Sequence, residues 1–151
     1  MPENLFSQQT AGQSKNQNST FKAPPQGNLP PIFHKAKGLY LLWYGYYQIL
    51  PKTHRYTLGK KIDECLLSIL ETIATATFLT PTEKQPYIKF AIKKTDLLKI
   101  LSLLLWETKT LDDKKYTALA ERETELGRML GGWSGKIASK QNSPANQLGE
   151  K

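Results

Sequence analysis

The segment TLGKKIDECLLSILETIATATFL, residues 57–79, decides the fold of this chain. Its apolar residues recur at spacings of three and four, which places them on one face of an α-helix. Pro81 stops this helix, because proline lacks the backbone N–H that a helix interior requires. The stripe consists of Leu58, Ile62, Cys65, Leu66, Ile69, Ile73 and Ala76. A face this continuous predicts an amphipathic helix with one buried side.

Three further segments repeat the pattern, over residues 31–50, 82–109 and 112–139. Sustained alternation of period two, the mark of a half-buried strand, is missing, and so are Asn-Gly and Asp-Gly hairpin turns. Four amphipathic helices joined by short loops predict an all-α fold, an antiparallel up-and-down four-helix bundle.

The ends of these helices follow from local chemistry. Pro31 can open the first helix and Pro51 ends it. We expect Thr82 to cap the third helix, with Pro86 still in the tolerant first turn. Asp112 favours the positive N-terminal end of the fourth helix.

Both ends of the chain differ in composition from the helical part. Residues 1–30 and 141–151 are rich in Gln, Asn, Ser, Gly and Pro and show no apolar period. Such segments bury too little surface to offset their ordering entropy, so we predict disordered tails. The four-helix bundle is therefore expected over residues 31–140.

Composition limits the partners and the compartment. The 151 residues include 21 Lys and Arg against 13 Asp and Glu, a formal charge of +8, which favours an anionic partner. The lone cysteine, Cys65, excludes an intrachain disulfide and fits a reducing compartment. The most apolar stretch, residues 97–106, carries Lys99 and has half of the ~20 residues that a bilayer span needs. Together with the lack of a secretory signal, this predicts a cytoplasmic protein without a membrane partner.

Signals of catalysis are weak. His34 and His54 are far apart in sequence and lie in or beside loops. Of Glu121, Glu123 and Glu125, only the first and third share a helix face, and no Glu-x-x-His motif accompanies them. We therefore expect no catalytic residues, no metal site, no cofactor and no enzymatic activity.

Basic residues are better organised. Lys89 and Lys93 are four residues apart, a spacing at which like charges mildly destabilise an isolated helix. The predicted nucleic-acid-binding residues are Lys52, Arg55, Lys60, Lys61, Lys89, Lys93, Lys99, Arg128, Lys136 and Lys140. Six to ten phosphate contacts would make binding strongly salt-dependent and blind to sequence. The alternative is a solvated lysine surface that serves solubility.

The stretch ELGRMLGGWSGK, residues 125–136, places glycines inside a predicted helix, where each costs ~0.5–1 kcal/mol relative to alanine. Gly127, Gly131 and Gly135 form one row beside the apolar stripe. A row of small residues allows a second backbone to approach, from a neighbouring helix or from another subunit. A frayed helix end is the alternative, but Trp133 and Ile137 continue the stripe past the glycines. We therefore assign the three glycines and Trp133 to packing or to an oligomer interface.

Two sequence motifs resemble those of a known protein family. LPKTHRYTLGKKI, residues 50–62, and ELGRMLGGW, residues 125–133, resemble the four-helix-bundle family that includes the accessory variability determinant of diversity-generating retroelements. The ribosomal-RNA intervening-sequence bundle proteins are similar in fold. The resemblance covers about residues 38–140.

The resemblance implies a homo-oligomer, a pentameric barrel, that binds nucleic acid and associates with a reverse transcriptase. The partners it implies are that enzyme and template-repeat RNA or complementary DNA, during mutagenic retrohoming. Members can carry two basic residues four apart in the third helix; here Lys99 matches the first and Leu103 stands in place of the second. Lys99, Lys89 and Lys93 are then the candidates for contacting the polymerase or its RNA.

The sequence leaves three hypotheses about the function of this protein. The leading one is a non-enzymatic accessory protein of a diversity-generating retroelement. The second is a structural or interaction bundle of the intervening-sequence type without a role in retrohoming. The third, an enzyme, would require a bound metal or cofactor.

Overall fold

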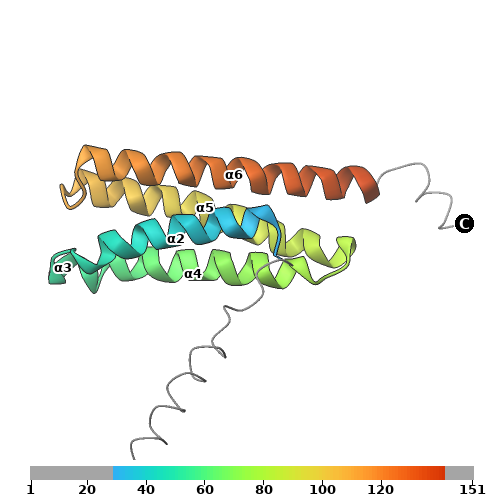
Figure 1. Cartoon of the computed structure of the whole chain (residues 1–151), viewed down its shortest axis with the longest axis horizontal. Helices are drawn as coiled ribbons and strands as arrows, with labels where there is room; N and C mark the ends of the chain where they lie inside the picture. The colour runs from blue at the N-terminus through green and yellow to red at the C-terminus, as the bar shows by residue number, and fades with distance from the viewer. Residues whose placement is uncertain (1–28, 142–151) are drawn as a thin grey trace, which may run out of the picture.

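A computed structural model describes residues 29–141, and this part of the chain is helical and contains no strand (Figure 1). The helices are α2 (Pro31–Gln48), α3 (Lys52–Arg55), α4 (Leu58–Thr77), α5 (Pro81–Glu107) and α6 (Asp113–Gln141). The tails predicted for residues 1–30 and 141–151 fall almost wholly outside the described residues. The four long helices match the four predicted segments to within two residues at each end.

One predicted helix start was wrong. The N-cap of α5 is Thr80 and not Thr82, and the backbone N–H of Thr80 donates to Glu83 Oε2 at 3.2 Å. Pro81 takes the first helical position, where its fixed φ suits the helix and its missing N–H costs nothing. The helix therefore begins before Thr82, and Pro86 lies in its interior rather than in its first turn.

The short helix α3 was not predicted, and it forms a tight corner between α2 and α4. The Arg55 guanidinium donates from Nη2 to the carbonyl oxygens of Gln48 at 2.8 Å and Leu50 at 3.0 Å. These carbonyls lie at the C-terminal end of α2, which carries the negative end of the helix dipole. Arg55 therefore caps α2 from outside the helix.

The four long helices pack through their apolar stripes. Helix α4 contacts both α2 and α5, and α6 contacts both α5 and α2. Successive long helices run in opposite directions, so α3 lies at one end of the molecule and the start of α5 lies beside the end of α6 at the other (Figure 1). The largest fully buried side chains come from all four: Leu39, Trp43, Ile62, Leu66, Ile69, Ile73, Ile88, Leu98, Leu105, Leu119, Leu126 and Leu130.

The turn between α5 and α6 is held by polar contacts of α6. Asp112 Oδ1 accepts the backbone N–H of Lys115 at 2.8 Å, so Asp112 caps α6. The Trp106 indole N–H donates to Asp113 Oδ1 at 2.8 Å, and its ring stacks on Tyr116.

Within the described residues, no helix combines the length and the hydropathy that crossing a bilayer demands.

Replacing Gly59 by alanine tests the corner. An added Cβ would lie 2.9 Å from the His54 carbonyl oxygen and 3.1 Å from Leu50 Cδ1, so backbone would have to shift. We expect Gly59→Ala to lower the free energy of unfolding by about 1–3 kcal/mol, measured by urea denaturation.

Gly45→Ala in α2 is the matched control, because nothing lies within 4 Å of the Cβ it would gain. This variant should gain about 0.5–1 kcal/mol from helix propensity. Equal stabilisation by both substitutions would contradict the tight corner.

Candidate nucleic-acid interface

Nine of the ten predicted basic residues divide between the two ends of the molecule. Lys52, Arg55, Lys60 and Lys61 lie at the end that carries α3. Arg55 is engaged in capping α2, and Lys60 Nζ lies 3.9 Å from Glu64 Oε1 in an exposed pair. Glu64 holds Lys60 only weakly, because solvent screens the attraction between two exposed charges.

The opposite end gathers more positive charge. The first half of α5 lies beside the second half of α6, and Gln85 Nε2 donates to Ser134 Oγ at 3.0 Å between them. We call residues 81–95 and 126–141 the basic end. Its cationic residues are Lys84, Lys89, Lys93, Lys94, Arg128, Lys136 and Lys140. Glu83 is the acidic residue of these two segments.

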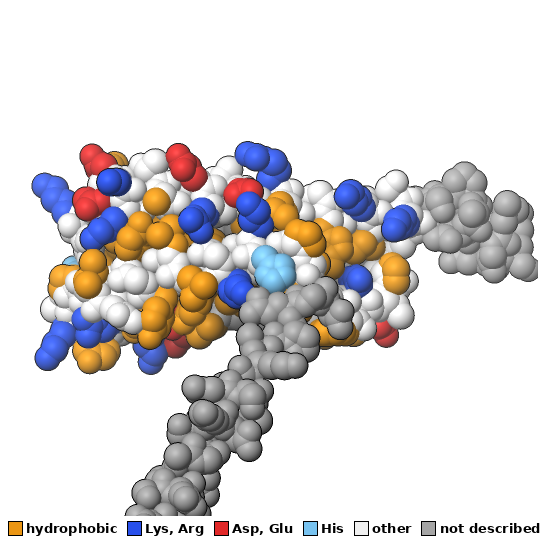
Figure 2. Space-filling model, viewed as in Figure 1, with side chains coloured by type: hydrophobic (Ala, Val, Ile, Leu, Met, Phe, Trp, Pro, Cys, Tyr) orange, Lys and Arg blue, Asp and Glu red, His pale blue; other side chains and the backbone are white. Residues whose placement is uncertain are grey.

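Figure 2 shows this segregation along α6, on the face that it draws. Acidic and basic side chains are mixed over the first half of the helix, whereas the second half carries Lys and Arg without an acidic residue. In the described part of the chain, Lys89, Lys93, Arg128 and Lys136 are exposed and form no ion pair. Their charges are therefore not neutralised by neighbouring carboxylates.

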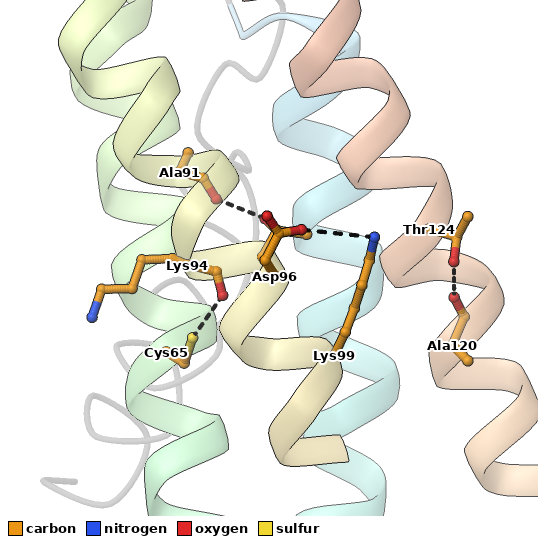
Figure 3. Close-up of polar contacts among 8 residues, drawn as sticks. Cys65, Ala91, Lys94, Asp96, Lys99, Ala120 and Thr124 are labelled. Atoms are coloured by element: carbon orange, nitrogen blue, oxygen red, sulfur yellow. Dashed lines mark hydrogen bonds and ion pairs between the residues drawn. The ribbon is translucent and has the colours of Figure 1, made fainter. Parts of the chain in front are cut away.

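Lysines of α5 point to different sides of the helix. Figure 3 shows Lys94 extending on the side of α4 and Lys99 extending toward α6. The Lys94 ammonium lies 5.4 Å from the centre of the Phe90 ring, and Lys99 Nζ lies 4.0 Å from Asp96 Oδ1. Lys99, the residue that matches the family pattern, thus lies between the two ends and outside the basic end. The ten predicted residues do not form one continuous patch.

The glycine row lies on an open face of α6. A Cβ added at Gly131 or Gly135 would meet nothing within 4 Å, whereas one at Gly127 would lie 3.4 Å from Lys99 Nζ. Helix α6 continues to Gln141, six residues past the last of these glycines. Close packing against a neighbouring helix of the same chain does not explain Gly131 and Gly135. Trp133 is half-buried against the core, with the Lys84 ammonium 5.7 Å from its ring centre.

Glu123 is a buried acid that the sequence reasoning did not single out. Its side chain is 2% exposed, and the Ser102 hydroxyl of α5 donates to Glu123 Oε1 at 2.5 Å. Burial raises the pKa of Glu123 to about 7, although the bond from Ser102 and the charge of Lys99 oppose the rise. The sequence feature that could have revealed its burial is its position on the helix. Glu123 lies four residues after Leu119 and three before Leu126, which places it on the apolar face.

Metal binding and thiol chemistry are the other possibilities for the helical core. Within residues 29–141, no group of three or more His, Cys, Asp or Glu side chains is placed to hold a metal ion. Cys65 donates its thiol hydrogen to the Lys94 carbonyl at 3.2 Å, and burial raises its pKa (Figure 3). The thiolate that a nucleophile or metal ligand needs is therefore disfavoured.

A depression of about 590 Å³ lies at the turn between α5 and α6. Its lining includes the carboxylates of Glu107, Asp112 and Asp113, with Lys109 as the cation. A polyanion would meet repulsion there. This depression does not extend the basic surface.

Comparisons with known proteins identify the fold alone. No family model matches the chain, and no curated protein matches it. Its structure is similar to the crystal structure of a protein of unknown function from the S23 ribosomal protein family of Bacteroides thetaiotaomicron VPI-5482. The TM-score is 0.62 at 17% identity, over 67% of this chain and 92% of that chain. This helical fold is compatible with the family resemblance of the two motifs.

The buried Glu123 makes stability depend on pH. Its pKa of about 7 in the folded chain lies above the ordinary value of 4.5, so the folded state binds the proton more tightly than the unfolded state. The free energy of unfolding should therefore fall as pH rises from 4.5 through 7. We expect a loss of about 2–3 kcal/mol between pH 5 and pH 8, measured by urea unfolding.

Glu123→Gln should abolish most of this loss, because the amide oxygen still accepts the Ser102 bond and carries no charge. Glu121→Gln, at an exposed position of the same helix, is the control and should keep the wild-type pH dependence. An unchanged slope in Glu123→Gln would refute the assignment.

Proposed function

We propose that this protein is an antiparallel four-helix bundle that acts, without catalysis of its own, as a nucleic-acid-binding accessory protein. The bundle arrangement is supported by the contacts of each long helix with two others and by their alternating directions (Figure 1). The similarity to a solved helical structure over 67% of the chain supports it further. We place the protein in the cytoplasm, where the buried Cys65 stays reduced.

The segregation of charge at the basic end carries the proposal. Cations of α5 and α6 lie together at this end of the molecule, and Lys89, Lys93, Arg128 and Lys136 have no carboxylate partner within the described residues. When these side chains neutralise phosphates, the cations condensed on the nucleic acid are released into solution, which favours binding at low salt. A surface of this kind contacts the backbone of a nucleic acid and leaves its sequence unread.

The role that we propose in a diversity-generating retroelement rests on the motifs at residues 50–62 and 125–133, which resemble those of the accessory variability determinant family. In this role the protein docks to the reverse transcriptase of a diversity-generating retroelement and binds template-repeat RNA or complementary DNA. The first motif includes Arg55 and Gly59, which build the corner at α3. The corner holds the exposed Lys52 and Lys61 on a rigid frame at the end opposite the basic end.

Self-association is part of the proposal, with a pentamer as the state that the resemblance implies. The open space over Gly131 and Gly135 supports it, because these glycines cost helix stability and a Cβ at either position would meet no atom of residues 29–141 within 4 Å. A backbone from another subunit could approach α6 along this row. Gly127, which faces Lys99, and Trp133, which faces Lys84, would support the helix from within the chain.

The second candidate is a structural bundle of the ribosomal-RNA intervening-sequence type. The solved structure with the similar fold comes from the S23 ribosomal protein family and is of unknown function, and its helical fold fits this candidate as well as the first. The genes beside this one distinguish the two. A neighbouring reverse transcriptase with template and variable repeats supports the first, and a position inside a ribosomal-RNA gene supports the second.

Reversing the charge of Lys89 and Lys93 tests the basic end. We expect Lys89→Glu/Lys93→Glu to weaken RNA binding at least tenfold and to flatten its dependence on salt, because fewer counterions are released. Thermal melting should be unchanged, since both side chains are exposed and have no partner within residues 29–141.

The matched control changes net charge equally at the other end of α6. Lys114→Glu/Lys115→Glu adds acidic residues to the first turn, where the helix dipole tolerates them. RNA affinity measured by fluorescence anisotropy should fall less in this control. Equal losses in both variants would mean that only net charge matters.

Gly131→Leu tests the subunit contact. The leucine meets open space within the chain and improves helix propensity by ~0.5–1 kcal/mol, so the folded subunit should not be destabilised. We expect the oligomer measured by light scattering to dissociate. Gly45→Leu, also directed to open space but on α2, is the control and should assemble normally.

A further inference from the structure

Two aromatic rings are exposed among the lysines of the basic end. Tyr87 is 42% exposed and Phe90 is 44% exposed, both on α5. Together with Thr72 and Pro86 they line a depression of about 240 Å³ between α4 and α5. This volume lies below the range of about 300–1,000 Å³ that is typical of sites for whole small-molecule ligands. It suits one flat ring better than a complete ligand.

The chemistry around this depression is cationic. Lys94 holds its ammonium 5.4 Å above the Phe90 ring, and Lys89 and Lys93 are exposed on the same half of α5. The four lining residues Thr72, Pro86, Tyr87 and Phe90 carry no charge. An occupant should therefore present a flat apolar ring to the depression and negative charge to the lysines beside it.

We propose that the basic end binds single-stranded nucleic acid, with one unpaired base against Tyr87 and Phe90 and the flanking phosphates on Lys89 and Lys93. The inference rests on the proposed nucleic-acid function and specifies its substrate class. Aromatic side chains beside a positive track are the means by which proteins hold single strands, because every base presents a π-face. A duplex keeps its bases stacked and offers only its phosphates, so the rings would gain nothing from it.

Three probes separate the contributions of base and backbone. They are a 20-nucleotide oligo-dT strand, the matching oligo-dT/oligo-dA duplex, and an abasic oligomer of equal length that keeps the phosphates and lacks the bases. Affinity is measured by fluorescence anisotropy over a salt series. Wild-type protein should bind oligo-dT about tenfold more tightly than the abasic oligomer.

The variant Tyr87→Leu/Phe90→Leu keeps an apolar surface and removes both rings. It should bind oligo-dT about tenfold more weakly than wild type, with the same dependence on salt, and its affinity for the duplex should be unchanged. Tyr44→Leu, at a 48% exposed ring on α2, is the matched control and should bind like wild type. Thermal melting of all variants verifies that they fold.

Each other outcome overturns the inference in a recognisable way. Equal wild-type affinity for oligo-dT and the abasic oligomer, or no effect of the double leucine variant, refutes base stacking and leaves the phosphate surface standing. Poly-glutamate serves as a further probe: if the double leucine variant loses poly-glutamate binding in parallel with oligo-dT binding, the site is one for acidic peptides instead. Failure of wild type to bind any of the nucleic acids refutes the proposed function itself.

Discussion

Burial of four apolar stripes against one another is the constraint on which the rest of the structure depends. Leu39, Ile69, Leu98 and Leu126 lie in one core, one from each long helix, and are essentially inaccessible to solvent. Each stripe fixes the rotation of its helix about its own axis, because turning the helix would expose the stripe and bury charge. The outward positions of Lys89, Lys93 and Arg128 follow from this setting. The surface chemistry is thus a consequence of the core.

Periodicity predicted the helices because it is a local property that the core preserves. The stripe from Ile62 to Ala76 is buried along its whole length, as expected for a helix with one apolar face. Capping was harder to predict from spacing, since Thr80 and Thr82 are both suitable residues. The proline between them decides in favour of Thr80, because it occupies the first helical position.

Features that depend on contacts distant in sequence were not predictable in this way. Arg55 looked like a surface cation, but its guanidinium reaches back to carbonyls of residues 48 and 50. Glu123 was separated from Glu121 and Glu125 by its helix face alone, and its partner Ser102, which makes its burial tolerable, comes from another helix. The first half of α5 likewise lies beside the second half of α6 only because the two helices pack antiparallel, which spacing within one helix does not reveal. The sequence supplied the ten candidate cations, and the fold decides which of them are neighbours.

The unequal distribution of charge along α6 has a consequence at a distance. On its first half Asp113, Glu121 and Glu125 offset the cations Lys114, Lys115 and Arg122, whereas its second half carries Arg128, Lys136 and Lys140 without an acid. This difference contributes to the permanent electric dipole moment of the molecule. In the field of a polyanion this moment exerts a torque, which turns the protein before any atoms touch. The torque operates over roughly one Debye length, ~8 Å at physiological ionic strength. A polyanion would therefore orient this protein in solution as well as attract it.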